Sequence, residues 1–158
     1  MFEYISTHFE WQNTIMIVST RGRYALRVMV DLAQHQEDGY VPLNVIAGRQ
    51  DISEKYLESI LKVLVQDELL TGLRGRGGGY RLTKEPKDYT LGEILRLTEG
   101  SLAPVACTDD GEHDCPRKES CPSHPVWQKL DTMINDFFDG ITLADLIQPS
   151  EESKEKLS

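Results

Sequence analysis

The sequence lacks any long apolar segment. Its longest unbroken apolar runs are four residues, as at residues 15–18, whereas a transmembrane helix needs about 20 mostly apolar residues. The first fifteen residues also lack the basic start and the apolar stretch of a secretory signal peptide. We therefore expect neither membrane insertion nor secretion, and we predict a cytoplasmic protein.

Cysteine is scarce and odd in number. Three cysteines cannot all pair in disulfides, which favours an intracellular thiol or metal role. The 158 residues, 39% apolar and 27% charged, are ordinary for one globular domain with its own core. The sequence has no internal repeat and no pattern of a nucleophile beside a base, so we expect no catalytic residues and no enzyme.

Basic residues are also fewer than acidic ones, which gives a net charge of −9, but the excess of acidic residues is unevenly distributed along the chain. Residues 16–87 carry 11 Lys and Arg against 9 acids, whereas residues 88–158 carry 6 against 15. The whole-chain charge is therefore a poor guide to what the N-terminal half binds, and nucleic acid stays open as a partner.

The order of the predicted elements is that of a winged helix-turn-helix. We predict a mainly helical fold with a small β-hairpin wing and a long C-terminal dimerisation helix. Helices are expected at residues 21–36, 43–49, 54–65, 91–100 and 124–139, and hairpin strands at 69–74 and 79–83. Thr90 and Glu93 form a predicted capping box at the start of the fourth helix, and Ser123 is the predicted cap of the last one. The expected regions are an N-terminal extension at 1–15 that we expect to be disordered, a DNA-binding domain at 16–87, a region at 88–147 with a linker helix, cysteine-rich loop and dimerisation helix, and a flexible tail at 148–158.

The helix after the predicted turn has one apolar face and one polar face. An α-helix fits the major groove, where the polar face can meet bases and phosphates. The hairpin has no acid between residues 69 and 84, and a thin arginine-bearing loop can enter a minor groove. The alternatives are a merely solvated helix face and a simple glycine turn. The candidate DNA-binding residues are Arg21, Arg23, Ser53, Lys55, Tyr56, Glu58, Ser59, Lys62, Arg74 and Arg76.

The cysteines fall in one loop with the pattern C-x7-C-x5-C-x2-H. Cys107, Cys115, Cys121 and His124 are a complete set of four ligands for zinc or for a small iron–sulfur cluster. The absence of a C-x2-C pair counts mildly against zinc. His113 is a competing fourth ligand, and free thiols beside a surface histidine are the remaining alternative.

The last long helix has an aromatic apolar stripe. Packing against its own domain would explain it, but the N-terminal helices already supply a core, so we favour a dimer interface. Its members are Trp127, Leu130, Ile134, Phe137, Phe138 and Ile141.

Several segments resemble the IscR-type winged-helix transcriptional regulators, a family that includes NsrR, RirA and CymR. The resemblance covers about residues 16–147, in the segments STRGRYAL (19–26), ISEKYLE (52–58), RGRGGGYRL (74–82), HPVW (124–127) and ITLADL (141–146). Two features depart from the family pattern. The first cysteine gap is seven residues instead of five, and Asp51 stands where a glycine is expected, although aspartate tolerates the left-handed conformation.

The resemblance implies a homodimeric bacterial regulator, a repressor or a dual regulator, that binds palindromic double-stranded DNA. It implies an iron–sulfur cluster on the four ligands above, [2Fe–2S] rather than [4Fe–4S], reporting cluster supply, iron, oxygen or nitric oxide. Glu58 and Arg74 match the family's recognition-helix Glu and wing Arg. The alternatives are a zinc-stapled regulator, a CymR-like regulator answering a thiol signal, a small molecule or a protein partner, and more remotely an iron–sulfur electron carrier.

Overall fold

The computed structural model describes residues 18–109 and 115–158; the predicted extension at 1–15 and the competing ligand His113 lie outside these ranges. The fold is mainly helical with one two-stranded antiparallel sheet, as the sequence predicts. The elements in chain order are α1 (Thr20–Gln34), η1 (Gln36–Asp38), α2 (Leu43–Gln50), α3 (Glu54–Gln66), β1 (Leu70–Leu73), β2 (Gly79–Leu82), η2 (Pro86–Asp88), α4 (Leu91–Glu99), η3 (Ala106–Thr108), α5 (His124–Asp139), α6 (Leu143–Ile147) and α7 (Glu151–Lys156).

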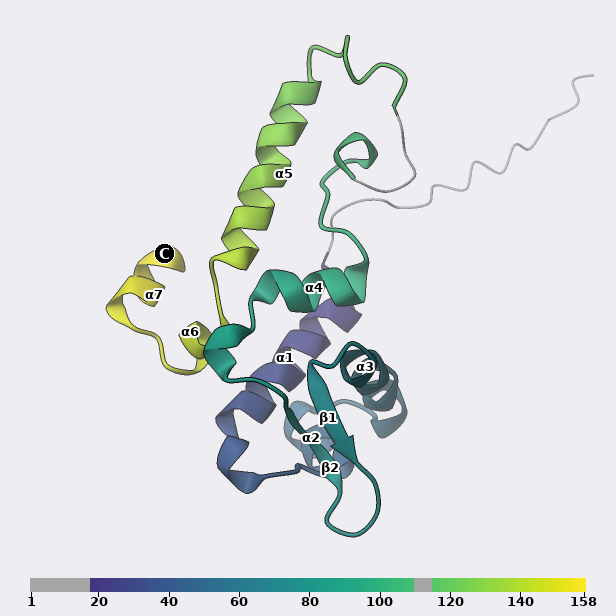
Figure 1. Cartoon of the computed structure of the whole chain (residues 1–158), viewed down its shortest axis with the longest axis vertical. Helices are drawn as coiled ribbons and strands as arrows, with labels where there is room; N and C mark the ends of the chain where they lie inside the picture. Colours follow the sequence, from purple (N-terminus) through teal and green to yellow (C-terminus); the bar gives the residue numbers. More distant parts are fainter. Residues whose placement is uncertain (1–17, 110–114) are drawn as a thin grey trace, which may run out of the picture.

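Helices α1, α2 and α3 form the helix-turn-helix unit at one end of the molecule (Figure 1). Ser19 caps α1 and Ser53 caps α3, each accepting a hydrogen bond from a backbone N–H in the first turn. The apolar residues of both helices recur at helical spacing, which turns one face of each into the core. The fully buried residues include Ala25, Val28 and Met29 of α1 and Leu57, Ile60, Leu61 and Leu64 of α3.

A buried ion pair fixes α2 against α1. Asp31 is 2% exposed. It accepts hydrogen bonds from Nε and Nη2 of Arg49 at 2.9 and 2.7 Å and from Nε2 of Gln50 at 3.0 Å. A buried carboxylate is tolerated only when it is paired and hydrogen-bonded in this way. The C-terminal end of α2 is therefore held in place just before the turn.

Asp51 forms the turn between α2 and α3 in the left-handed conformation, with φ 53° and ψ 50°. The prediction that aspartate can replace the expected glycine here is confirmed. Ser53 then begins α3 at once.

The wing is a four-pair hairpin in which Leu70 lies opposite Leu82 and Leu73 opposite Gly79. Its free turn points away from the rest of the chain (Figure 1). A Cβ at Gly79 would lie 2.2 Å from the carbonyl oxygen of Val41, so only glycine allows β2 to approach that strand segment. Val41 and Tyr80 exchange two backbone hydrogen bonds of 2.9 Å there.

Helix α4 packs across α1 and joins the same core, which also takes in Ile141 and Leu143 from beyond α5. Thr90 caps α4 by accepting from the N–H of Glu93 at 3.1 Å. The predicted reciprocal contact is replaced, since the Glu93 carboxylate accepts from Lys84 Nζ at 3.1 Å. One core thus includes residues from both sides of the predicted boundary at residue 87.

Helix α5 extends away from the core and meets it only at its C-terminal end (Figure 1). There Arg96 of α4 donates to both carboxylate oxygens of Asp139 at 2.8 Å and to Oδ1 of Asn135 at 2.6 Å. At the other end, Ser123 occupies the cap position but its side chain makes no capping bond. The predicted Ser123 cap is therefore wrong, because its hydroxyl lies 3.2 Å from the sulfur of Cys121 instead.

The C-terminal segment is helical where the sequence predicts a flexible tail. Ser150 caps α7, and Ser153, which is 2% exposed, donates to Asp145 of α6. The difference arises because a polar segment can fold when a neighbouring carboxylate accepts from its hydroxyl groups. Among the described helices, none combines the length and the apolar content needed to cross a bilayer.

Substitutions at Asp51 test the helix-turn-helix turn. Asp51→Gly should raise the free energy of unfolding by about 0.5–1 kcal/mol, because glycine adopts positive φ without strain. Asp51→Val should lower it by about 1–2 kcal/mol. Asp67 also ends a helix but has φ −95°, so Asp67→Gly is the control and should be destabilising. Urea unfolding followed by circular dichroism measures all three, and a stabilising Asp67→Gly would contradict the explanation.

Candidate nucleic-acid interface and ligand loop

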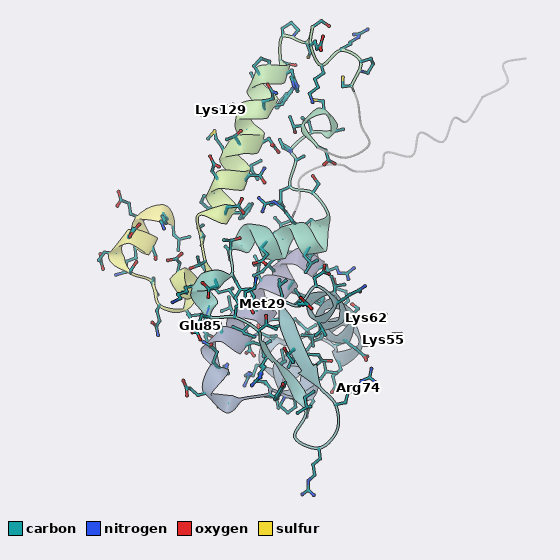
Figure 2. All side chains as sticks on the ribbon, viewed as in Figure 1. Met29, Lys55, Lys62, Arg74, Glu85 and Lys129 are labelled. Atoms are coloured by element: carbon teal, nitrogen blue, oxygen red, sulfur yellow. The ribbon has the colours of Figure 1, made fainter. Side chains whose placement is uncertain are left out.

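A groove of about 960 Å³ runs between α3 and the wing. Five of the ten predicted DNA-binding residues line it: Lys55, Glu58, Ser59, Lys62 and Arg74. Lys55, Lys62 and Arg74 lie on the same side of the domain, at the opposite end of the molecule from Lys129 of α5 (Figure 2). The fold therefore brings the polar face of α3 and the arginine-bearing wing to one surface.

The polar face of α3 is exposed because the opposite face holds the helix in the core. Lys55, Glu58 and Lys62 follow each other at three- and four-residue spacing and are all exposed. Across residues 18–109 and 115–158, none of the three side chains makes a hydrogen bond or an ion pair. Two cations and one carboxylate are thus available to a ligand in the groove, the carboxylate for an amino group such as that of cytosine.

Ser53, Tyr56 and Ser59 have partners within the protein. Ser53 caps α3, and the Ser59 hydroxyl donates to the carbonyl of Tyr56 at 2.6 Å. The Tyr56 ring makes an edge contact with the ring of Tyr24 in α1. Ser53 at the cap and Tyr56 and Ser59 within α3 are all exposed, so they can shape the groove as well as contact a ligand.

Arg74 directly follows β1, and Arg76 lies in the glycine turn, where Gly77 adopts φ 75°. Both arginines are exposed, and neither has a hydrogen-bond or salt-bridge partner in the part of the chain that the structure describes. Arg81 differs, because its guanidinium carbon lies 4.6 Å from the centre of the Tyr40 ring. The wing therefore has two unengaged arginines at its free end and an engaged one on β2.

Arg21 and Arg23 lie in the first turn of α1. Arg23 is exposed and donates to the hydroxyl of Thr20 at 3.2 Å. Arg21 donates to the carbonyl of Ser59 at 3.3 Å, while its Nε is buried without a hydrogen-bond partner among the described residues. Arg21 thus holds α3 against α1, and Arg23 is the better placed of the two for an external phosphate.

Sequence reasoning missed several residues that line the groove. Gln66 lies four residues after Lys62 on the same face of α3, so helical spacing could have found it. Leu73 ends β1 with its side chain 48% exposed, and Pro42 and Leu43 enter the groove from the start of α2. These apolar residues can contact deoxyribose or a thymine methyl group, and no sequence signal marks them.

The four predicted ligands lie at the far end of α5 from the groove. Cys107 is in η3, which packs against α5; Cys115 and Cys121 flank a turn; and His124 is the first residue of α5. All three cysteines are free and half-buried. Within the two described ranges, no three His, Cys, Asp or Glu side chains are grouped closely enough to hold a metal ion. The structure thus gathers these ligands in one region but not at one point.

His124 has an unusual environment. Its side chain is buried, and neither Nδ1 nor Nε2 has a hydrogen-bond partner in the described structure. Two unsatisfied polar atoms in a buried ring are costly unless a ligand completes them. Nearby, the Ser123 hydroxyl lowers the pKa of the half-buried Cys121 thiol because it stabilises the thiolate.

One face of α5 carries an apolar stripe that is exposed to solvent. Val126, Leu130, Met133 and Phe137 are 60%, 38%, 56% and 50% exposed, at helical spacing. Of the six stripe residues expected from the sequence, Ile141 is buried and Trp127, Ile134 and Phe138 are half-buried, which leaves Leu130 and Phe137 outside. The predicted stripe is therefore two stripes, and sequence reasoning missed Val126 and Met133.

The chain matches the model of a known family over residues 18–149, the Rrf2 family, described as iron-dependent transcriptional regulators. The HTH-type transcriptional regulator IscR of Aliivibrio salmonicida (strain LFI1238) is 36% identical over 136 residues, which is 86% of this chain and 80% of that protein. A putative HTH-type transcriptional regulator of Azotobacter vinelandii is 38% identical over 136 residues, or 86% and 82% of the two chains.

Solved structures agree with the sequence match. The structure of T. potens IscR has a TM-score of 0.65 at 38% identity and covers 87% of this chain and 90% of that one. The structure of CymR, the global cysteine regulator of B. subtilis, has a TM-score of 0.68 at 33% identity, covering 85% and 98%. These relatives are regulators rather than enzymes, and the surface built from α3 and the wing is where a winged helix meets DNA. The chain belongs to the Rrf2 family of DNA-binding transcriptional regulators.

Proposed function

We propose that the protein is a cytoplasmic, homodimeric regulator that binds palindromic operators and responds to a metal cluster held by Cys107, Cys115, Cys121 and His124. The observation that carries the cluster proposal is the buried His124 ring with two unpartnered nitrogens. Three free cysteines in the same region complete a donor set that suits iron–sulfur ligation.

The donor set fits a [2Fe–2S] cluster in chemistry, since three thiolates and one imidazole supply four ligands. When bound, such a cluster supplies a redox-active iron centre. Cys107, Cys115, Cys121 and His124 would hold the cluster beside the start of α5. Because η3, which carries Cys107, packs against α5, the cluster would lie next to the helix that we propose as the dimer contact.

Anaerobic purification with iron, sulfide and zinc analysis tests the cluster. We expect a coloured protein that contains iron and acid-labile sulfide, with two irons per subunit if the cluster is [2Fe–2S]. Cys115→Ala should lose the iron while the far-ultraviolet circular dichroism stays that of a folded protein. Ser120→Ala, in the same loop, is the matched control and should keep it. A colourless protein with stoichiometric zinc would contradict the cluster and favour a structural site.

The exposed stripe of α5 supports the homodimer. It consists of Val126, Leu130, Met133 and Phe137 on a helix that reaches away from its own core (Figure 1). A continuous apolar face of this kind is normally covered, and a second copy offers an identical face to pair with it. Two copies related by a twofold axis present two grooves, which explains a palindromic operator.

Met133→Asp tests the dimer contact, because it places a charge in the middle of the stripe. We expect it to convert the dimer to a monomer in sedimentation velocity and to weaken operator binding. Gln128→Glu adds a charge to the same helix at an exposed position that the stripe does not include, so it should leave the dimer intact. If both variants remain dimers of equal stability, the dimer interface lies elsewhere.

In each copy, we propose that the wing and α3 bind one half-site together. We expect Lys55 and Lys62 to contact phosphates, Glu58 a base edge, and Arg74 and Arg76 the minor groove, because all five are exposed in or beside the groove. Contacts of this type release condensed counterions, so the binding constant should fall steeply with salt.

Arg74→Ala and Arg76→Ala test the wing. An operator is first selected from a random-sequence duplex pool with the wild-type protein, and affinity is then measured by fluorescence anisotropy at several salt concentrations. Each variant should bind about tenfold more weakly, and each lost phosphate contact should reduce the slope of log K against log salt by about 0.9. Lys154→Ala, on α7, should change neither quantity. Unchanged affinity in both arginine variants would contradict the wing assignment.

A thiol-responsive regulator is the second candidate, favoured by three free cysteines and by the Ser123 hydroxyl 3.2 Å from the Cys121 sulfur. A thiolate at this position would react with oxidants when no metal is bound. A metal-free protein, even after attempted reconstitution with iron and sulfide, would support this candidate.

A further inference from the structure

The Tyr89 hydroxyl lies at the base of the wing. Its ring is completely buried. The hydroxyl accepts hydrogen bonds from the backbone N–H groups of Thr83 and Lys84, both at 2.9 Å, and donates to the carbonyl of Leu69 at 2.8 Å. Leu69 precedes β1, and Thr83 follows β2. One phenol therefore joins both strands at the end of the hairpin opposite the arginine turn.

The wing needs such an anchor because it is a small hairpin. Four residue pairs in two strands are marginally stable alone. Backbone bonds also attach it to the domain, at the Val41–Tyr80 pair on the second strand and from the N–H of Leu69 to the carbonyl of Leu64 in α3. Fixing the base as well leaves the hairpin little freedom to pivot. Arg74, directly after β1, lines the groove, so its position follows from that restraint.

The backbone of Tyr89 is itself held from beyond α5. The N–H of Leu143 donates to the carbonyl of Tyr89 at 3.0 Å, and the N–H of Leu91 donates to the carbonyl of Ile141 at 2.9 Å. The phenol is thus placed by the segment that joins α5 to α6. Its position is independent of the DNA-facing side chains.

We propose that Tyr89 is the positioning residue of the wing, holding Arg74 at the groove through the hydrogen bonds of its hydroxyl. Tyr89 touches no DNA itself. The inference rests on the proposed role of the wing in DNA binding, but it needs neither the cluster nor the second copy.

A double-mutant cycle on the selected operator duplex tests the proposal. Tyr89→Phe keeps the buried ring and removes the hydroxyl, and we expect it to weaken binding about fivefold. In the Arg74→Ala background the same change should cost less than about twofold, because nothing remains for the hydroxyl to position. In the Lys62→Ala background, on α3, the cost should stay about fivefold. A general loss of stability would weaken binding equally in all three backgrounds.

Tyr40→Phe is the matched control, since this tyrosine also contacts the wing through its ring and the structure gives its hydroxyl no hydrogen bond within residues 18–109 and 115–158. It should leave affinity unchanged. Thr83→Val is a second variant that removes a neighbouring hydroxyl from the same end of the hairpin, where it donates to Glu68 and Leu69. It should also couple to Arg74 and not to Lys62. Circular dichroism at the assay temperature checks that each variant is folded.

Equal costs of Tyr89→Phe in the three backgrounds would overturn the proposal while leaving the wing's role in DNA binding intact. An Arg74→Ala change that alone leaves affinity unaltered would overturn both, because the wing would then have no contact to position. The double-mutant cycle can be interpreted whether or not the protein is a dimer and whether or not it holds a metal.

Discussion

The ion pair between Arg96 of α4 and Asp139 of α5 fixes how α5 is attached to the rest of the protein. Both side chains are more than a third exposed, so the pair contributes little free energy, and its importance lies in geometry. The fork of the guanidinium meets both carboxylate oxygens, raising the pKa of Arg96 and lowering that of Asp139. A Cβ at Gly92 would lie 2.0 Å from a carboxylate oxygen of Asp139, so a larger residue there would displace the carboxylate from the guanidinium.

This attachment lies between the two sites of the proposed function. The groove between α3 and the wing lies at one end, and the cysteine loop lies beyond the free end of α5 (Figure 1). Two structural connections join the ends: α4, which leads into the loop, and the segment after α5, which bonds to the backbone of Tyr89. If the loop regulates DNA binding as we propose, its signal would pass through α4 or α5.

The sequence predicts the local features of this structure well. The order of helices, the hairpin and the left-handed Asp51 all follow from spacing, caps and glycines, which are properties of neighbouring residues. The predictions that failed concern the partner that a side chain takes in the folded protein. Ser123 turns to the Cys121 sulfur, Glu93 to Lys84 and Ser153 to Asp145, and no local pattern records those partners. The sequence predicts a single apolar stripe on α5, because it does not reveal which face of the helix another element covers. For the same reason, the spacing of the cysteines could suggest ligands but not how far apart the loop holds them.

Charge explains how a chain with net charge −9 can approach DNA. The ion pairs of the described residues engage Arg49, Lys84, Arg96, Lys154 and Lys156, all outside the groove. The groove and wing cations Lys55, Lys62, Arg74 and Arg76 have no such partners in the described structure, and Glu58 is the one acidic residue among the predicted DNA-binding residues. Most of the remaining acid lies in the half of the sequence that builds the linker loop and α5 to α7. In the proposed binding mode, this distribution would repel phosphates from that half and favour their approach to the groove.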